Sequence, residues 1–469
     1  MSGLGRYPLE PSTDETRRML EEAARFVVAY LEGLEEAPAV NPDLDPELRA
    51  RIAEEPPAAG RPFAEILHIL ERGAKEGFNT SGPGYLAYIP GGGIVAAGIA
   101  DLLADVMNRY VGIWQPAPAF AEIEWRVVRW LCDLFDLPAE ARGILTSGGS
   151  MANFSAIVAA RKAKLPEDFL NGTLYATDQA HHSVAKAAVL AGFPAESVRI
   201  VPHTPALRMD VGALREAIAQ DRAAGSRPFC VVASAGTTNT GAIDPIRDIV
   251  EVRDGEDLWL HVDGAYGGFF QLTERVRRRF AGIDRADSIT LDPHKAMFLP
   301  YGTGALLVRD GERLRAAHSV HADYLQDLAG EAEVPSFADH SPELSRDFRG
   351  LRVWLPLMLH GVEAFRAALE EKLDLTEMLH ERLSAIPELE VPWEPEVTVV
   401  TFRLRGDGDE STRALLDRIN ASRRVFLSST LIDGRFFIRA CIVSHRTHRD
   451  RVEEAAEIIG AAVREVAGS

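Results

Sequence analysis

The sequence predicts an α/β protein with a large, mostly parallel seven-stranded sheet and a smaller C-terminal α+β part. Short apolar runs alternate with helical patterns between Gly143 and Leu307, which is typical of parallel strands connected by helices. Downstream of this region the pattern changes to a long helical region, a strand, a helix and a hairpin. A chain of 469 residues also exceeds the usual size of a single hydrophobic core, so we expect at least two lobes.

The strands of the predicted sheet are short apolar runs, and several end in clusters of polar residues. They cover residues 143–146, 174–177, 198–201, 229–234, 258–262, 288–291 and 304–308. Helices are expected to begin near Met151, Val184, Val211 and Pro245. In the smaller part we expect a helical region over 352–383, a strand over 397–404, a hairpin pairing 425–431 with 436–443 around Asp433-Gly434, and a closing helix over 449–466.

The N-terminal segment predicts an amphipathic helix that is separate from the sheet. Ser12 and Glu15 have the spacing of a capping box, and apolar residues follow at helical intervals. A proline-rich stretch then separates this helix from the rest of the chain, so its apolar stripe is expected to dock on another lobe or a partner subunit. We expect domain limits of 1–85 for the N-terminal helical segment, 86–355 for the large domain and 356–469 for the small domain.

Composition excludes several classes of function. The chain carries 51 Lys and Arg against 70 Asp and Glu, a net charge of −19, so most of its surface would repel a nucleic acid. No apolar run reaches membrane-spanning length and the first residues lack a signal-peptide core, which predicts a cytoplasmic protein without a membrane partner. The cysteines Cys132, Cys230 and Cys441 are far apart in apolar surroundings, and we expect them to be buried and reduced.

A lysine at the end of one predicted strand is the first candidate for chemistry. Residues 288–295 read Ser-Ile-Thr-Leu-Asp-Pro-His-Lys, so the apolar run is broken at Pro293 and Lys295 follows it. Ligand crevices in open α/β sheets form at such strand ends. An amine that loses hydration there becomes nucleophilic and can form a Schiff base with a carbonyl cofactor. Alone, such a lysine is usually a solvated loop residue.

Polar clusters follow four other predicted strands and provide complementary chemistry. Residues 146–153, Thr-Ser-Gly-Gly-Ser-Met-Ala-Asn, join a strand to a helix, where the amides of Gly149 and Ser150 suit a phosphate. Asp263, in His-Val-Asp-Gly-Ala-Tyr-Gly, suits a protonated ring nitrogen, and Ala265 can lie flat against the ring.

The two remaining clusters supply a flat ring and a hydroxyl. His181, in Asp-Gln-Ala-His-His-Ser, can stack on an aromatic ring, and Thr238, in Ala-Gly-Thr-Thr, can bond a phenolic oxygen. Each motif alone has an ordinary structural explanation as a turn, a cap or a satisfied polar residue. Their combination at neighbouring strand ends predicts a pocket for pyridoxal 5′-phosphate.

The order of these motifs resembles the group II pyridoxal-phosphate decarboxylases, the family of aromatic-L-amino-acid and glutamate decarboxylases. The resemblance extends from about Phe78 to the C-terminus. It implies the fold type I architecture of pyridoxal-phosphate enzymes, a homodimer with active sites at the subunit interface, and α-decarboxylation of an L-amino acid to an amine and CO₂. An aromatic substrate is favoured because few basic residues can be assigned to the substrate pocket.

The resemblance also implies a role for individual residues. Lys295 would carry the cofactor covalently, Asp263 would pair with the pyridine nitrogen and His181 would stack on the ring and contact the substrate. The phosphate would be held by Gly149, Ser150 and His294, and Thr238 and Ala265 would flank the ring. The substrate would contact Tyr88, Pro90, Trp114 and Arg439, and no metal is expected.

The sequence departs from the family where a loop tyrosine is implied to return a proton to the substrate. Residues 330–345 contain no tyrosine, and the corresponding position falls on Phe337 or His340, with Tyr324 as an outside candidate. Histidine can deliver a proton near neutral pH, and phenylalanine cannot. We take His340 as the catalytic acid, which keeps the amine as product. The alternative implied by the resemblance is oxidative deamination to an aldehyde, ammonia and peroxide.

Other readings of the same residues remain open. An aminotransferase or lyase of the same fold would use the same lysine, carboxylate and phosphate cradle. A pyridoxal-fold scaffold without a cofactor is disfavoured by the intact Lys295, Asp263 and Ser150. A metalloenzyme is disfavoured because His445-x-x-His448 lacks the context of a zinc motif.

Overall fold

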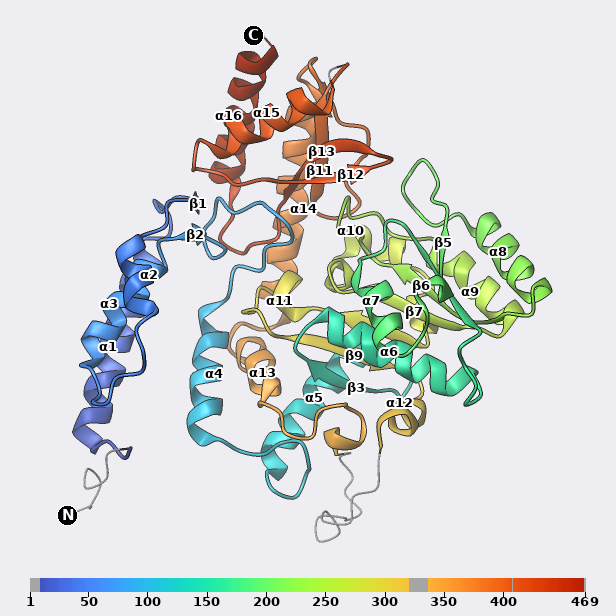
Figure 1. Ribbon diagram of the computed structural model, residues 1–469, viewed down its shortest axis with the longest axis horizontal. Helices are drawn as coiled ribbons and strands as arrows, with labels where there is room; N and C mark the ends of the chain where they lie inside the picture. Colours follow the sequence, from blue (N-terminus) through green and yellow to red (C-terminus); the bar gives the residue numbers. More distant parts are fainter. Residues whose placement is uncertain (1–8, 320–335, 407, 468–469) are drawn as a thin grey trace.

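The computed structural model describes residues 9–319, 336–406 and 408–467. An N-terminal helical arm, a large α/β part and a smaller α+β part follow each other along the chain (Figure 1). The expected fold class is confirmed by the two main sheets, one of seven mostly parallel strands and one of four antiparallel strands.

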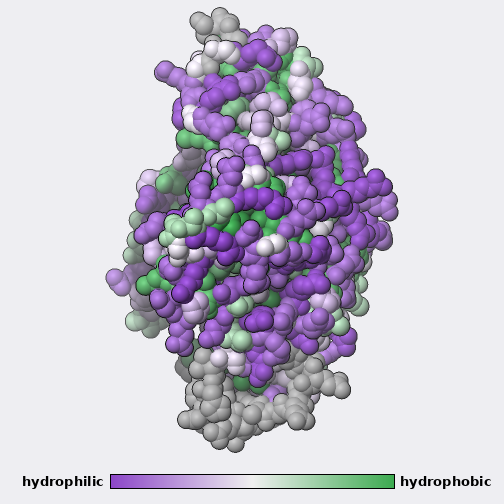
Figure 2. Space-filling model, turned by 90° about the vertical axis from the view of Figure 1, so that its right-hand side faces the viewer, coloured by the Kyte–Doolittle hydropathy of each residue, from purple (hydrophilic) through white to green (hydrophobic). Residues whose placement is uncertain are grey.

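The arm begins with α1 (Thr13–Glu32), and its first turn confirms the capping box. The amide of Glu15 donates to Ser12 Oγ at 3.3 Å, and Glu15 Oε2 accepts from the amide of Ser12 at 2.7 Å. The arm continues with β1 (Val40–Asn41), α2 (Pro46–Ile52), α3 (Phe63–Gly73) and β2 (Gly77–Phe78). None of the residues of α1 is buried in the described chain. On the opposite side of the molecule, the face that carries α8 and α9 is predominantly hydrophilic (Figure 2).

The seven-stranded sheet has the order β3-β9-β8-β7-β6-β4-β5, and β9 alone runs antiparallel to its two neighbours. Its strands are β3 (Arg142–Thr146), β4 (Gly172–Thr177), β5 (Val198–Val201), β6 (Arg227–Ser234), β7 (Trp259–Gly264), β8 (Ser288–Leu291) and β9 (Gly304–Val308). All seven predicted strands are present, and each begins and ends within two residues of its expected position. The six strands that run in one direction therefore present their carboxyl ends at one edge, where a ligand crevice is expected.

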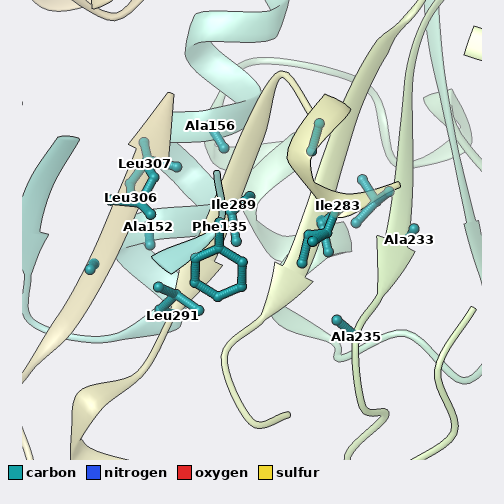
Figure 3. Close-up of a cluster of buried hydrophobic side chains, with 14 of the residues drawn as sticks. Phe135, Ala152, Ala156, Ala233, Ala235, Ile283, Ile289, Leu291, Leu306 and Leu307 are labelled. Carbon is teal, nitrogen blue, oxygen red and sulfur yellow. The ribbon is translucent and has the colours of Figure 1, made fainter. Parts of the chain in front are cut away.

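Helices cover both faces of this sheet. They are α4 (Val95–Met107), α5 (Pro118–Leu134), α6 (Gly149–Lys164), α7 (Ser183–Leu190), α8 (Val211–Ala223), α9 (Ile246–Glu256), α10 (Glu274–Arg277), α11 (Pro293–Ala296), α12 (Gly311–His318) and α13 (Arg349–His360). Figure 3 shows Ala152 and Ala156 of α6 among the apolar side chains of β8 and β9. Their small side chains let α6 approach the sheet closely, so the start of α6 lies beside the strand ends.

The smaller part consists of a four-stranded sheet covered by helices. Its elements are α14 (Val362–Ser384), β10 (Leu389–Glu390), β11 (Val399–Leu404), α15 (Asp409–Asn420), β12 (Ser428–Ile432), β13 (Arg435–Cys441) and α16 (Arg449–Ala467). Asp433 and Gly434 form the hairpin turn with φ of 50° and 74°, as the Asp-Gly signal predicts. The hairpin is shorter than expected because Phe426 pairs instead with the segment at Gly84 and Leu86.

The long helical region is two helices, because Gly361, with φ of 75°, separates α13 from α14. α14 belongs to both hydrophobic cores. Phe365 and Leu369 pack in the core of the large sheet, whereas Leu379 and Leu383 pack in the core of the small sheet. The domain limits 1–85, 86–355 and 356–469 stay a prediction, and α14 is the element that joins the last two.

Two expectations from composition concern cysteines and membranes. Cys132, Cys230 and Cys441 are buried free thiols, as expected. Within the described part of the chain, every helix is too short or too polar to cross a membrane. The cytoplasmic location stays a prediction.

Candidate active site

A cavity of about 270 Å³ lies at the carboxyl edge of the seven-stranded sheet. Residues that follow β3, β4, β6, β7 and β8 all contribute to it, as expected for parallel strands whose ends align. Its lining consists of Ser147, Gly148, Gly149, Ser150, Met151, Asn153, His181, Ser183, Ser234, Gly236, Thr237, Thr238, Asp263, Ala265, Tyr266, Asp292, His294 and Lys295. All eight residues that the sequence predicts as cofactor contacts are in this set.

The start of α6 forms one wall of the cavity. A helix leaves its first amides without intrahelical partners, so those of Gly149 and Ser150 are available to an anion. A Cβ atom at Gly149 would lie 2.9 Å from Asp292 Oδ2 and 3.1 Å from the Ala265 Cβ. Glycine is therefore required here because a larger residue would fill the space between the helix and the strand ends.

Asp263 is the penultimate residue of β7 and is 8% exposed. Its Oδ1 accepts from the amide of Ala265 at 3.1 Å, and its Oδ2 accepts from Asn153 Nδ2 at 3.0 Å. A buried carboxylate needs such donors to remain charged. Both hydrogen bonds also fix the direction in which the carboxylate faces the cavity.

The turn after β8 provides an amine. Lys295 Nζ lies 2.8 Å from Asp292 Oδ2, so the two side chains form an ion pair inside the cavity. His294 Nδ1 donates to the carbonyl of Thr303 at 2.7 Å. Burial lowers the pKa of His294, against the opposing effect of Asp292. Asp292 is therefore a charged partner of the lysine.

His181 follows β4 and completes the cavity. Its Nδ1 is 2.7 Å from Ser183 Oγ, and burial lowers the pKa of its imidazole, which favours a neutral ring. The carboxylate of Asp263 acts in the opposite direction and is the second largest influence. Thr238 comes from the loop after β6 and is half-buried.

The chain matches the model of the pyridoxal-dependent decarboxylase conserved domain over residues 46–405. It belongs to the pyridoxal-dependent decarboxylase family. It is 34% identical to the aromatic-L-amino-acid decarboxylase of Bacillus atrophaeus, with 98% of this chain and 97% of that protein covered.

Solved structures agree with this assignment. The crystal structure of Oryza sativa TDC with pyridoxal phosphate and tryptamine has a TM-score of 0.92 at 28% identity, covering 98% of this chain and 99% of that one. Rhodiola rosea 4-hydroxyphenylacetaldehyde synthase has a TM-score of 0.89 at 25% identity, with the same coverage. The cofactor of this decarboxylase is pyridoxal phosphate, and the enzyme is a carboxy-lyase.

The residues of the cavity fit this cofactor. The free amides at the start of α6 suit its phosphate, the oriented carboxylate of Asp263 suits its ring nitrogen, and Lys295 suits its aldehyde. The absence of a Cβ at Gly149 lets the start of α6 lie close to Asp292 and Ala265, so its free amides reach the same cavity as the strand ends. These three groups come from separate elements and line one cavity.

The predicted substrate residues of the decarboxylase lie outside this cavity. Tyr88 is 53% exposed, Pro90 is buried, and Trp114 is half-buried in a turn before α5. Arg439 is 3% exposed and bonds acceptors in the protein. It donates to the carbonyls of Asn239 and Tyr88 at 2.8 and 3.4 Å, to the carbonyl of Thr238, and to Ser428 Oγ at 3.0 Å. Their contact with substrate stays a prediction.

His340 and Phe337 are also outside the cavity. His340 is 5% exposed, its Nδ1 donates to the carbonyl of Ser336 at 3.0 Å, and burial lowers its pKa. Phe337 is buried next to it. The segment lies beside the one that precedes Trp114, because the amide of Ala338 donates to the carbonyl of Gly112 at 2.9 Å. Tyr324 lies outside the described residues.

Three buried side chains in and next to the cavity were not predicted from sequence. Asn153 and Ser183 line the cavity, and His261 lies below it. Asn153 and Ser183 are the last residues of two motifs that the sequence analysis singled out, and His261 begins a third. The signal was present as motif membership, but their contacts join residues 30 to 110 positions apart, which spacing does not reveal.

Proposed function

We propose that this enzyme decarboxylates an aromatic L-amino acid to the corresponding amine and CO₂. The main support is one cavity in a chain of the pyridoxal-dependent decarboxylase family, which is lined by Lys295, Asp263, His181 and the start of α6. The aromatic substrate is supported by the Bacillus atrophaeus relative and by the Oryza sativa structure with tryptamine.

The roles proposed for the cavity residues follow from their chemistry. Pyridoxal phosphate, when bound, supplies an aldehyde that reacts with amines and a ring that withdraws the electron pair left by departing CO₂. Lys295 would hold the aldehyde carbon and yield it to the substrate amine. The amides of Gly149 and Ser150, with His294, would bind the phosphate, and Thr238 and Ala265 would flank the ring.

Asp263 and His181 would control charge and orientation. The carboxylate of Asp263 would keep a proton on the ring nitrogen, because a charge-assisted hydrogen bond in a buried site favours the protonated form. His181 would stack on the ring and contact the substrate carboxylate. Holding the bond to be broken in the correct direction is the main contribution that a protein makes to such a reaction.

The substrate side of the site is proposed to include Tyr88, Pro90, Trp114 and Arg439. Arg439 joins Thr238 to Tyr88 through their carbonyls, so it lies between the cofactor side and the substrate side. A substrate carboxylate would have to replace one of these carbonyls as its acceptor. This exchange is favourable for a charged acceptor, because charge-assisted hydrogen bonds are the stronger ones.

His340 is proposed to return the proton to the carbon that loses its carboxylate. Its Nδ1–H is used by the Ser336 carbonyl, so the ring must first take up a proton on Nε2. Burial lowers the pKa of His340, and the protonated fraction falls as the pH rises. Amine formation is therefore expected to decline on the alkaline side.

A second outcome is supported by the likeness to the aldehyde synthase and by the lack of a tyrosine in residues 330–345. In that reaction the substrate, dioxygen and water give an aldehyde, CO₂, ammonia and hydrogen peroxide. The two outcomes share the loss of CO₂ and differ in the fate of the substrate carbon.

We also infer a homodimer in which a second copy completes the substrate side. Exposed apolar residues gather on α1 and α4: Met19, Leu20, Val27, Val28, Ile99, Leu102, Leu103, Val106 and Met107. Apolar patches of this kind mark protein interfaces. The arm and α4 lie on the same side in Figure 1, opposite to the hydrophilic face of Figure 2.

The test is a panel of L-amino acids with CO₂, amine, aldehyde and peroxide measured together. Tryptophan, tyrosine and phenylalanine should release CO₂ and equal amounts of amine, and glutamate should not react. Aldehyde and peroxide in equal amounts would replace the first proposal with the second. No CO₂ from any amino acid, by an enzyme that carries its cofactor, would overturn both.

The role of His340 is tested in the same assay. His340→Ala should lower the rate of amine formation by about 100-fold, the scale of losing an acid catalyst. His68→Ala, at an exposed histidine of α3, is the matched control and should not change it. Amine formation by His340→Ala at the wild-type rate would remove His340 from the mechanism.

A further inference from the structure

The side chain of Asn153 lies under the cavity and uses all of its polar groups. Its Nδ2 is 3.0 Å from Asp263 Oδ2 and 2.9 Å from Ser183 Oγ, and its Oδ1 is 3.0 Å from His261 Nε2. It is 1% exposed, so no bulk water competes for these bonds. A carboxylate can only accept, which means that the amide nitrogen faces Asp263 and the amide oxygen faces His261.

The direction of each hydrogen bond below Asn153 follows from its neighbours. The amide oxygen only accepts, so His261 carries its hydrogen on Nε2. Its Nδ1 then accepts from the hydroxyl of Ser288 at 2.8 Å, and Ser288 Oγ accepts in turn from Trp259 Nε1–H at 2.8 Å. Burial lowers the pKa of His261 to about 4, consistent with a neutral ring.

A second series of hydrogen bonds runs from Asn153 through Ser183 to His181. Ser183 Oγ accepts from Asn153, so its hydroxyl hydrogen is available for His181 Nδ1 at 2.7 Å. The backbone amide of Ser183 donates to the same Nδ1 at 3.3 Å. A ring nitrogen that receives two donors carries no hydrogen, so a neutral His181 carries it on Nε2.

We propose that Asn153 is a positioning residue that orients the Asp263 carboxylate and, through Ser183, fixes the hydrogen of His181 on Nε2. One amide group thereby couples two sides of the cofactor: the acid for the ring nitrogen and the imidazole for the ring face. His181 is left with a single N–H donor, which suits a substrate carboxylate and does not suit a doubly protonated acid. This inference rests on the proposed function for the identity of the ligands in the cavity.

The alternative is that Asn153 only fills space and stabilises the fold. The two possibilities differ in what happens to Asp263 and His181 when donors are removed one at a time. Asn153→Ala removes the donor to Asp263 and the donor to Ser183, whereas Ser183→Ala removes the hydroxyl that bonds His181 and affects the His181 side alone. Asn420→Ala is the matched control, because Asn420 makes two half-buried hydrogen bonds to the backbone of Leu427, just before β12 and outside the cavity.

The first measurement is the affinity for pyridoxal phosphate, followed by the absorbance of the bound cofactor. Asn153→Ala should weaken binding about 10- to 100-fold, the size of one hydrogen bond to a charged group. Asn420→Ala should bind within about twofold of the wild type, and Ser183→Ala should lose less affinity than Asn153→Ala. Wild-type affinity in Asn153→Ala would overturn the proposal.

The second measurement is the pH dependence of cofactor absorbance and of CO₂ release. Ser183→Ala removes a donor to His181 Nδ1, so that nitrogen can take up a proton more easily. The groups that face His181 are Asp263 and Asp292, which favour its protonation, and His182 and Lys295, which oppose it. We expect the acid limb of both pH profiles to move to a higher pH by about one unit in Ser183→Ala, a shift that one hydrogen bond can produce.

Each outcome decides the proposal or the function separately. An unchanged acid limb in Ser183→Ala would overturn the His181 part, and this small deletion keeps that part testable if Asn153→Ala does not fold. If the wild type releases no CO₂, the proposed function fails, and the cofactor affinity and absorbance still test the role of Asn153. A general loss of stability would change cofactor affinity and absorbance in Asn420→Ala as well. We expect these two measurements to change only in Asn153→Ala and Ser183→Ala.

Discussion

The floor of the cavity and its substrate side are built in different ways. The floor is made of side chains that bond one another: Asn153 with Asp263, and Lys295 with Asp292. The substrate side consists of loops such as 88–93, 112–114 and 337–340, which are held through backbone groups. Arg446, for example, holds the glycine loop by donating to the carbonyls of Gly92 and Gly93.

This difference indicates which side of the site a single chain forms and which side it leaves incomplete. The floor lies where parallel strands end together, so the sheet alone brings its residues into contact. On the substrate side Tyr88 is half exposed, and Trp114 and His340 do not reach the cavity. We therefore propose that the residues of one subunit bind the cofactor and that the substrate contacts are completed by a second copy of the chain.

The largest effect on CO₂ release is expected from replacing Lys295 in the floor of the cavity. Lys295→Arg keeps a cation beside Asp292 and removes the amine that can join an aldehyde. CO₂ release should fall by at least about 10⁴-fold, the scale of losing a covalent catalyst. Borohydride should trap the cofactor on the wild type and not on the variant. A trapped adduct in Lys295→Arg would show that another amine carries the cofactor.

Asp263→Asn tests the floor without changing its shape. The variant retains an acceptor for the amide of Ala265, but it turns an amide nitrogen toward Asn153 Nδ2 and loses the charge that is proposed to keep the ring nitrogen protonated. CO₂ release should fall about 10²- to 10³-fold, as for loss of one electrostatic contact in a closed site. Asp257→Asn, at an exposed carboxylate paired with Lys164, is the control. Equal rates in the two variants would contradict the role of Asp263.

The same comparison explains how far the sequence predicts the molecule. The seven strands and the convergence of the eight residues on one cavity could be predicted, because five of the strands end in polar motifs and parallel strands align these ends. The hydrogen bonds of Asn153 could not be predicted. Its partners Ser183 and Asp263 are brought near it only by the strand order and by the closeness of α6 to the sheet. Arg439 was predicted from a motif match, and its bonds to the carbonyls of Thr238 and Tyr88 depend on how the small sheet meets the large one.

The proposed second copy is tested by placing a charge on α4. Leu103 is 45% exposed, and Leu103→Asp would bury an unpaired carboxylate in the interface. Self-association should weaken by about 100-fold or more, since breaking a buried charge arrangement costs about 3 kcal/mol. Sedimentation velocity measures the change. Leu170→Asp, at an exposed leucine outside α1 and α4, is the control, and equal self-association of the two variants would exclude α4 from the interface.

The smallest effect is expected where the small part of the molecule supports the substrate side. Burial lowers the pKa of His445 from 6.5 to about 3, and nearby Arg446 adds to this. Between these values the unfolded chain binds a proton that the folded chain does not, so the free energy of unfolding falls as the pH falls below 6.5. At pH 5.5 one such histidine costs about 1.4 kcal/mol.

His445→Gln removes this titration. Between pH 7.5 and 5.5 its free energy of unfolding, measured in urea, should fall by about 1.4 kcal/mol less than that of the wild type. His68→Gln, at an exposed histidine, should retain the wild-type difference. Parallel pH profiles for the wild type and His445→Gln would mean that His445 takes up its proton in the folded chain. The loop at Gly92 would then be supported by Arg446 without a neutral imidazole beside it.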